Sequence, residues 1–311
     1  GDIILTTPFL RVLRKKYPVA NIDFICKKQF ADAVRLNPNI NSLLIYDDSE
    51  EFKDNLLKRN YDWVIDLQNN FRSRKLYTKL NAKVDRFKKP SLKKFLLVHF
   101  KSNLLTPVKP IPERYFESVD ELISDFEGPE LFIPKEITPV LLPGKNYIGI
   151  CPGSQHYTKQ YPVEYQIELC NKLLAEGFTP VLFGGKSDLE ICKRINEKVP
   201  ETINLSNDND LFSTAANMKL CKVIICNDSG LMHTAAALKI PLIAIFGSTV
   251  KEFGFIPYGT KNVIIENEEI KCRPCSHIGR NKCPKAHFDC MMTLTPQLVF
   301  DKFKRFYDSV I

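Results

Sequence analysis

The sequence predicts an α/β protein with two domains, each built around a parallel sheet, and two features of the chain lead to this prediction. The first is a series of short apolar runs rich in β-branched residues, separated by amphipathic segments of helix length. These runs are residues 21–25, 42–46, 63–66, 147–150, 180–183, 223–226 and 242–246. Such runs are typical of strands buried on both faces of a parallel sheet, with crossover helices between them.

The second feature is an interruption of this alternation at residues 127–146, where Pro and Gly cluster. A cluster of this kind is typical of a linker between domains. The length of 311 residues also suits two domains of roughly 100–200 residues each. We therefore expect a first domain over residues 1–140 and a second over residues 141–295.

The two ends of the chain carry further signals. Thr295-Pro296 predicts the start of a last helix, because Pro is favoured at the first helical position. We expect this segment, residues 296–311, to cross back and pack on the first domain. At the other end, Gly1-Asp2 lies inside what reads as a motif, so we expect the first strand of the first domain to precede it.

Composition sets limits on the kind of protein. The chain has 44 basic and 36 acidic residues, a net charge of +8. This mild excess favours an anionic partner such as phosphate, nucleic acid or anionic lipid, and ordinary solubility charge is the alternative. No apolar run reaches the roughly 18–20 residues of a membrane span.

Ten cysteines are present, and six of them are scattered, mostly in apolar runs where Cys behaves as a small hydrophobic residue. They are Cys26, Cys151, Cys170, Cys192, Cys221 and Cys226. Scattered core thiols favour a reducing compartment, hence a cytoplasmic location. The other four are clustered at Cys272, Cys275, Cys283 and Cys290. Four thiols at this density can form a structural zinc site, although the spacing is not that of a zinc ribbon; two disulfides or four free thiols are the alternatives.

Residues 228–233 follow a predicted strand and open a helix. Small residues there let backbone N–H groups approach a diphosphate, which the helix dipole also attracts. The amides would come from Ser229, Gly230, Leu231 and Met232. His233 can donate to phosphate or be a buried, hydrogen-bonded residue. The alternative for the whole segment is a simple cap and turn.

Two other predicted strands are also followed by polar residues. Residues 152–162 contain Ser154, Gln155 and Lys159, and residues 184–188 contain two glycines and Asp188. The chain has no G-x-G-x-x-G sequence after a strand, which argues against a dehydrogenase.

Three segments resemble the lipopolysaccharide heptosyltransferases of glycosyltransferase family 9. They are Gly1 to Pro8, Asp228 to Leu238, and the cysteine-rich stretch from Cys272 to Met291. The resemblance implies the GT-B fold, in which two Rossmann-like domains with parallel sheets face each other across the active site. It also implies an ADP-heptose donor, an acidic lipopolysaccharide core as acceptor, and no catalytic metal.

The resemblance also implies roles for single residues. Asp2 matches the catalytic base of the family, and an N-cap of a helix over residues 3–16 is the alternative. Lys159 matches a lysine that contacts phosphate three residues before a proline, and Ser154 and Gln155 would add hydrogen bonds. A solvated loop lysine is the alternative for Lys159.

Two carboxylates complete the expected donor site. Asp188 resembles the ribose-binding carboxylate of GT-B donor domains, with a helix cap as the alternative. Asp228 would repel phosphate, so we expect it to orient the loop or to touch sugar hydroxyls.

Basic residues in the first domain suggest contacts to an acidic acceptor. Arg72, Arg74 and Lys75 follow a predicted strand in the region that faces the acceptor in the family, and a solvated helix face is the alternative. Residues 83–101 hold seven basic residues against one acid, and from Pro90 onward they predict a basic amphipathic helix that can bind anionic lipid. An ordinary surface helix is the alternative.

We therefore expect an inverting, metal-independent glycosyltransferase that is peripheral to the cytoplasmic face of the inner membrane. A nucleotide-sugar hydrolase or epimerase of the same fold is one alternative, since it would bind the donor alike. A basic module that binds nucleic acid is another. The chain lacks aromatic residues interleaved with basic ones on a predicted sheet face, so no nucleic-acid partner is expected.

Overall fold

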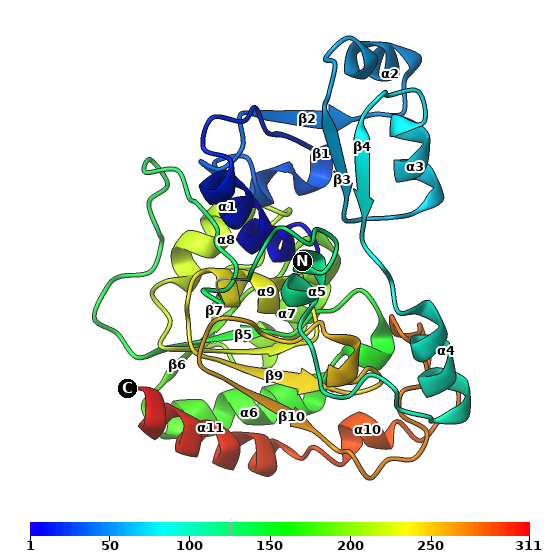
Figure 1. Ribbon diagram of the computed structural model, residues 1–311. Helices are drawn as coiled ribbons and strands as arrows, with labels where there is room; N and C mark the ends of the chain where they lie inside the picture. Colours follow the sequence, from blue (N-terminus) through cyan, green and yellow to red (C-terminus); the bar gives the residue numbers. More distant parts are fainter. Residues whose placement is uncertain (125) are drawn as a thin grey trace.

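The computed structural model describes residues 1–124 and 126–311, and its C-terminal half (residues 147–311) is built on one six-stranded parallel sheet (Figure 1). The strand order is β10-β9-β8-β5-β6-β7. The strands are β5 Tyr147–Cys151, β6 Thr179–Leu182, β7 Ile203–Asn204, β8 Val223–Asn227, β9 Leu242–Phe246 and β10 Asn262–Glu266. The four strands predicted in this half are therefore confirmed to within one residue at either end.

Helices cover both faces of this sheet because side chains alternate along each strand. In β5, Ile148 and Ile150 join a core that includes residues of α6, α7 and α11. Tyr147 and Cys151 join a second core on the opposite face with residues of α8 and α9. The helices of this half are α6 Val163–Ala175, α7 Leu189–Lys198, α8 Leu211–Met218, α9 Gly230–Ala237, α10 Asp289–Met292 and α11 Pro296–Val310.

The last helix does not return to the first domain, so that expectation is wrong. Its apolar stripe, which includes Val299 and Phe303, is fully buried in the core that lies against α6 (Figure 1). Phe178, just before β6, stacks edge-on against Phe303 with ring centroids 5.3 Å apart. Because the C-terminal half already offers an apolar groove beside α6, the helix is buried there without a crossing.

The N-terminal half (residues 1–124) is also α/β, but its strands form two separate parallel pairs. The first pair is β1 Asp23–Lys27 with β2 Ser42–Tyr46, and the second is β3 Trp63–Asp66 with β4 Lys83–Arg86. No strand among residues 1–124 joins the two pairs into one sheet. The helices of this half are α1 Thr7–Lys16, α2 Glu50–Leu57, α3 Phe71–Tyr77, α4 Ser91–Phe100 and α5 Ile111–Phe116.

Short 3₁₀ turns complete the described elements: η1 Ile4–Thr6, η2 Lys28–Ala33, η3 Tyr157–Lys159, η4 Lys186–Asp188 and η5 Lys251–Phe253. All six scattered cysteines are buried and form no disulfide, as predicted for core thiols. Among residues 1–124 and 126–311, every helix is too short or too polar to cross a membrane.

The two halves meet at several places, and two of them involve apolar clusters. The 3₁₀ turn η1 packs on α9, where Ile4 and Ala237 share one apolar cluster. On the other side, α4 and the approach to α5 pack on the segment after β9, where Leu97 and Leu105 contact Val250 and Phe253. Helix α4 therefore lies beside the C-terminal half, away from the strands that precede it in the chain (Figure 1).

Candidate functional site

The strand order places a switch point between β5 and β8. From β5 the chain adds β6 and β7 on one side, whereas β8, β9 and β10 extend the sheet on the other. At such a point the loops after two adjacent strands diverge and leave a crevice at their carboxyl ends, which is where ligands bind in open α/β sheets. The loops here are residues 152–162 after β5 and the turn at Asp228–Ser229 after β8.

The loop after β5 is held by Asn227, a residue that the sequence did not single out. The Asn227 Nδ2 donates to the carbonyls of Pro152 and Gly153, at 2.7 and 3.3 Å, and its Oδ1 accepts from Tyr161 N at 3.1 Å. Asn227 is only 2% exposed. Ser154 is also buried and donates to the carbonyl of Asp228 at 3.2 Å, so it joins the two loops.

Lys159 and Asp228 form an ion pair at this switch point. The Lys159 Nζ lies 2.7 Å from Asp228 Oδ2, and the two side chains are only 15% and 8% exposed. Thr249, in the loop after β9, donates to the same Asp228 oxygen at 2.7 Å. The loop after β5 is fixed further because Thr158 Oγ1 accepts from Ser248 Oγ and from Arg280 N, each at 2.8 Å.

The N-terminus of α9 presents donors without partners beside this pair. Ser229 is the N-cap residue, yet its Oγ makes no capping bond and has no hydrogen-bond partner among the described residues. The same holds for Nδ1 of His233, which is 4% exposed. Burial lowers the pKa of His233 to about 3, so the ring is neutral near pH 7. Met232 is buried in the core, so only its backbone amide can face a ligand.

Asp2 lies at the same helix terminus. A Cβ placed on Gly1 would be 3.0 Å from the His233 ring and 3.4 Å from Gly230 Cα, so the Gly1-Asp2 turn touches α9. The capping alternative is wrong, because the N-cap residues of η1 and α1 are Ile3 and Thr6, and neither element is capped by a side chain. Asp2 is exposed, and no hydrogen bond or ion pair of its carboxylate is found within the described chain.

Asp188 lies against the loop after β5. A Cβ on Gly153 would come within 2.1 Å of the Asp188 carboxylate, which packs on the bare backbone at that position. Asp188 Oδ2 also accepts from Gly185 N at 3.1 Å, so part of its role is to close the turn of η4. Gln155, the remaining donor-loop candidate, is exposed.

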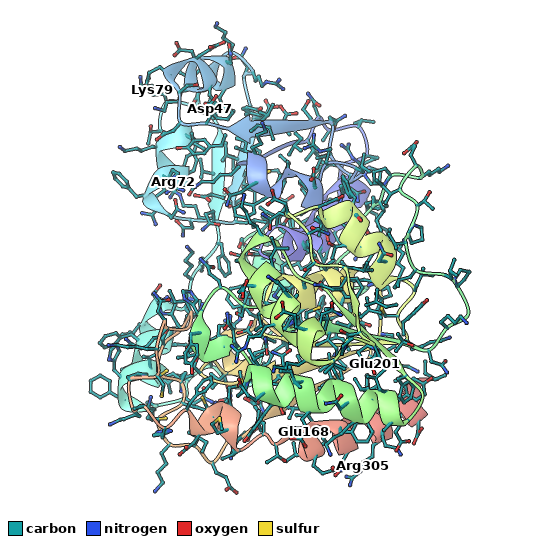
Figure 2. The ribbon with its side chains drawn as sticks, turned by 180° about the vertical axis from the view of Figure 1, so that it is seen from behind. Asp47, Arg72, Lys79, Glu168, Glu201 and Arg305 are labelled. Carbon is teal, nitrogen blue, oxygen red and sulfur yellow. The ribbon has the colours of Figure 1, made fainter. Side chains whose placement is uncertain are left out.

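The acceptor candidates on α3 lie apart from this group. Arg72, Arg74 and Lys75 are exposed, and no described interaction connects them to Asp2. Figure 2 shows Arg72 at the end of the molecule opposite Glu168 and Arg305. The buried Asp66 at the end of β3 organises the turn before α3, accepting from Asn69 N at 2.7 Å and Ser73 Oγ at 2.7 Å.

The cysteine-rich loop (residues 272–290) closes one side of the switch point. Its four thiols form no disulfide, with Cys290 buried and the other three partly exposed, and Cys272 Sγ lies 3.9 Å from His287 Nε2. Burial raises the pKa of Cys290 to about 12. Within the part of the chain that the structure describes, no three metal-ligating side chains are grouped so as to hold an ion.

Protein contacts hold this loop instead. The buried Arg273 donates to the carbonyls of Thr249 and Asn267 at 2.8 and 2.6 Å and pairs with Glu266 at 2.7 Å. Arg273 thus fixes the segment that carries Thr249. An open pocket of about 370 Å³ lies between the loop after β5 and the cysteine-rich loop. It is lined by His156, Gly279, Arg280, Asn281, Lys282 and Pro284.

Two α/β halves with parallel strands, the second with a switch point in its sheet, are the architecture of the GT-B class of glycosyltransferase folds. Residues 50–285 match the model of glycosyltransferase family 9 (heptosyltransferase), and the chain belongs to this family.

Relatives and solved structures agree with this assignment. The chain is 30% identical over 171 residues to lipooligosaccharide heptosyltransferase 2 of Haemophilus influenzae, covering 52% of this chain and 47% of that protein. It is 25% identical over 288 residues to lipopolysaccharide heptosyltransferase 2 of Salmonella typhimurium, covering 81% of each. The match thus spans about half the length of the Haemophilus influenzae protein and of two Campylobacter jejuni relatives.

Among solved structures, E. coli ADP-heptose lps heptosyltransferase II superposes with a TM-score of 0.76 at 22% identity, covering 99% of this chain and 96% of that one. A family 9 glycosyl transferase from Veillonella parvula superposes with a TM-score of 0.78 at 22% identity, covering 99% and 94%. At this identity the two superpositions support the fold alone.

Proposed function

We propose that this protein is an inverting heptosyltransferase that moves heptose from ADP-heptose to an acidic lipopolysaccharide core, without a metal ion. The observation that carries the proposal is the Lys159–Asp228 pair at the switch point, next to unpartnered donors at the α9 N-terminus. Membership of family 9 and the names of its relatives support heptose as the sugar. The family also favours transfer over the hydrolase and epimerase alternatives.

The donor diphosphate would bind between Lys159 and the first amides of α9. Lys159 supplies a full positive charge, and the amides of Ser229 to Met232 supply the partial charge of a helix N-terminus. Asp228 holds the Lys159 ammonium in place before the donor arrives. Asp188, beside Gly153, would take the ribose hydroxyls.

Asp2 would act as the base on the opposite side of the sugar. Its carboxylate takes the proton of an acceptor hydroxyl while the hydroxyl oxygen forms a bond to the anomeric carbon. The bond from that carbon to the diphosphate breaks, and ADP leaves with the bonding electrons. The developing negative charge is stabilised by Lys159 and the α9 amides. A single displacement of this kind inverts the anomeric centre.

The test of this mechanism is Asp2→Asn, which keeps the size of the side chain and removes the base. We expect ADP-heptose to bind with the parent's affinity while the rate of transfer falls by about 10²–10⁴-fold. Calorimetry with the donor and a transfer assay with a lipopolysaccharide core acceptor measure the two quantities. Asp54→Asn, an exposed change on α2, is the matched control. A parent-like rate for Asp2→Asn would remove Asp2 from the mechanism.

A lipid-linked acceptor requires the enzyme to work at a membrane surface, and α4 offers one. Its outer surface carries Leu92, Phe95 and Phe100, which are 70%, 51% and 68% exposed. Exposed Lys88 and Lys89 lie just before α4, and exposed Lys93 lies within it. Exposed apolar and basic groups on and beside one helix suit an anionic bilayer. Arg72, Arg74 and Lys75 stay candidates for more distant parts of the acceptor.

Vesicle sedimentation tests this surface. We expect the protein to sediment with vesicles that contain anionic phospholipid and to stay in solution when Lys88, Lys89 and Lys93 are changed to Glu. A second variant, in which the exposed Lys15, Lys16 and Lys302 are changed to Glu, has the same net charge as the first variant and should still sediment with the vesicles. Equal losses in the two triple variants would mean that only net charge matters, and that α4 is an ordinary surface helix.

A further inference from the structure

Lys94 differs from the other lysines of α4 because its side chain is turned inward. Its Nζ lies over the rings of Phe253 and Phe255, 6.0 and 5.5 Å from their centroids, and the residue is half-buried. Both rings belong to the segment after β9, in the C-terminal half. Lys94 is therefore located where the two halves meet, whereas its neighbour Lys93 is exposed.

No described residue neutralises this ammonium. Lys94 has no ion pair and no side-chain hydrogen bond in the described chain, and a phenylalanine ring compensates only weakly for lost water. Burial lowers the pKa of Lys94 to about 8, with the positive charges of Arg114 and Lys89 adding to the effect and Asp2 opposing it. A desolvated cation without a partner is the arrangement expected where an anion binds.

The neighbours of Lys94 indicate which anion. The carboxylate of Asp2, the proposed base, acts on Lys94 in the direction that raises the lysine pKa. Lys94 in turn contributes, after burial, to the lowered pKa of His277 in the cysteine-rich loop. The Arg114 guanidinium is less available to bind this anion, because it donates to the carbonyls of Glu252 and Phe253 at 2.8 and 3.2 Å. Lys159, by contrast, is already paired with Asp228 on the donor side.

We propose that Lys94 binds an acid group of the acceptor, a carboxylate or a phosphate, and thereby holds the acceptor hydroxyl at Asp2. The inference rests on the proposed transferase function. One helix then has two roles: its outer surface meets the bilayer, and Lys94 on its inner side receives the head of the lipid-linked acceptor. Lys94 is a binding and positioning residue, and the proton of the acceptor still goes to Asp2.

Lys94→Met tests the proposal, because methionine keeps an apolar stem against Phe253 and Phe255 and removes the charge. We expect the acceptor KM to rise by about 10- to 100-fold, the size expected for a hydrogen bond to a charged group. The donor Kd and kcat should stay near the parent values, and Lys94→Arg should restore much of the acceptor affinity. Lys93→Met is the control and should change none of these.

Modified acceptors identify the group that is bound. Two acceptors are compared, one with its carboxyl groups reduced and one with its phosphates removed. The modification that removes the bound group should weaken binding to the parent by the factor seen for Lys94→Met. The same modification should have no further effect on binding to Lys94→Met. A purely structural lysine would leave the variant as sensitive to both modifications as the parent. That result, or an unchanged acceptor KM, would overturn the inference.

The pH dependence gives a second readout. The groups that face Lys94 are Asp2, Arg114, Lys89 and His277. As the pH rises from 7 to 9, Lys94 loses its proton, so the acceptor KM of the parent should rise, while Lys94→Arg should show a flat profile. A parent protein without transferase activity would refute the proposed function, and the inference with it. An active parent whose KM ignores Lys94 refutes the inference alone.

Discussion

The Lys159–Asp228 pair is almost fully enclosed, which makes each partner dependent on the other. Removing one member of a buried pair leaves an uncompensated charge, and this costs more than the pair itself contributes. Asp228 without Lys159 would keep its Thr249 hydrogen bond and would face an incoming diphosphate as a bare carboxylate. Under the proposed function, the pair therefore holds the Lys159 ammonium in place for the diphosphate.

Lys159→Ala should for this reason weaken donor binding strongly. We expect a loss on the order of 2–4 kcal/mol in the binding or transition-state free energy for ADP-heptose, measured by calorimetry and by kcat/KM. Lys186→Ala is the matched control, since this lysine also follows a strand of the same sheet but is 70% exposed. If both variants bind donor like the parent, Lys159 is no phosphate ligand.

At the level of single residues, the sequence singled out Lys159 and Asp228, which the structure pairs, but not the residues that hold their loops. Lys159, Asp228 and Ser229 stand out because they follow strands and open helices. Asn227 and Arg273 carry no such signal: one ends an apolar run, and the other lies between two cysteines. Their roles depend on contacts to loops up to 75 residues away in the chain, which a local pattern cannot contain.

At the level of elements, the prediction depended on the apolar runs. Strands such as β8 and β9 are buried at every position, so their apolar runs mark them almost to the residue. Full burial is not required, because β2 is only partly buried and its run still matches. Strands β4 and β10 and the two-residue β7 were not predicted. Helix α11 was recognised from its start and its apolar stripe, but a stripe does not identify the surface that it packs against.

The cysteine-rich loop shows the same limit. The density of its cysteines suggested a zinc site as one of three possibilities. In the structure Arg273 and Lys101 hold the loop through backbone carbonyls, with Lys101 Nζ 2.7 Å from the carbonyl of Pro274 and 3.1 Å from that of Cys272. The backbone of Arg280 is also bonded to Thr158. These contacts fix the loop through protein groups, so we predict that it folds without an ion.

Chelation should therefore leave the stability nearly unchanged. We expect EDTA to shift the midpoint of thermal unfolding by less than about 1 °C, which corresponds to less than about 1 kcal/mol for a chain of this size. Metal analysis of the native protein accompanies the measurement. About one equivalent of zinc together with a large loss of stability on chelation would establish the metal site instead.

At the level of the whole molecule, the two halves are joined through the segment after β9. Ile111 N, at the start of α5, donates to the carbonyl of Gly254 at 2.9 Å, and Arg114 binds the two preceding carbonyls. Lys94 and Leu97 of α4 pack on the same segment. The proposed acceptor lysine is therefore positioned by residues 252–255, and the proposed base is connected to the same segment only indirectly, through α5, which packs on η1.

Gly254 allows the segment after β9 to approach α5 closely, and Gly177 in the same half provides a control. The φ of Gly254 is +87°, and a Cβ there would lie 2.6 Å from the carbonyl oxygen of Lys109 and 3.0 Å from the Arg114 guanidinium. Gly177 has a similar φ of +79°, but a Cβ there would meet no described atom within 4 Å beyond its chain neighbours. Alanine at either position has the cost of a left-handed backbone, about 1–2 kcal/mol, and only Gly254→Ala adds a clash across the two halves.

We expect Gly177→Ala to lower the free energy of unfolding by about 1–2 kcal/mol and to leave transfer at the parent rate.

Gly254→Ala should be destabilised by roughly 1–3 kcal/mol more, because backbone or the buried Arg114 must move. Its donor affinity should persist, since the loops after β5 and β8 belong to the C-terminal sheet. The transfer rate should fall, because Asp2 and Lys94 are no longer held opposite the donor. Urea unfolding, donor calorimetry and the transfer assay measure the three quantities. Identical behaviour of the two variants would show that alignment of the halves does not depend on the contact at Gly254.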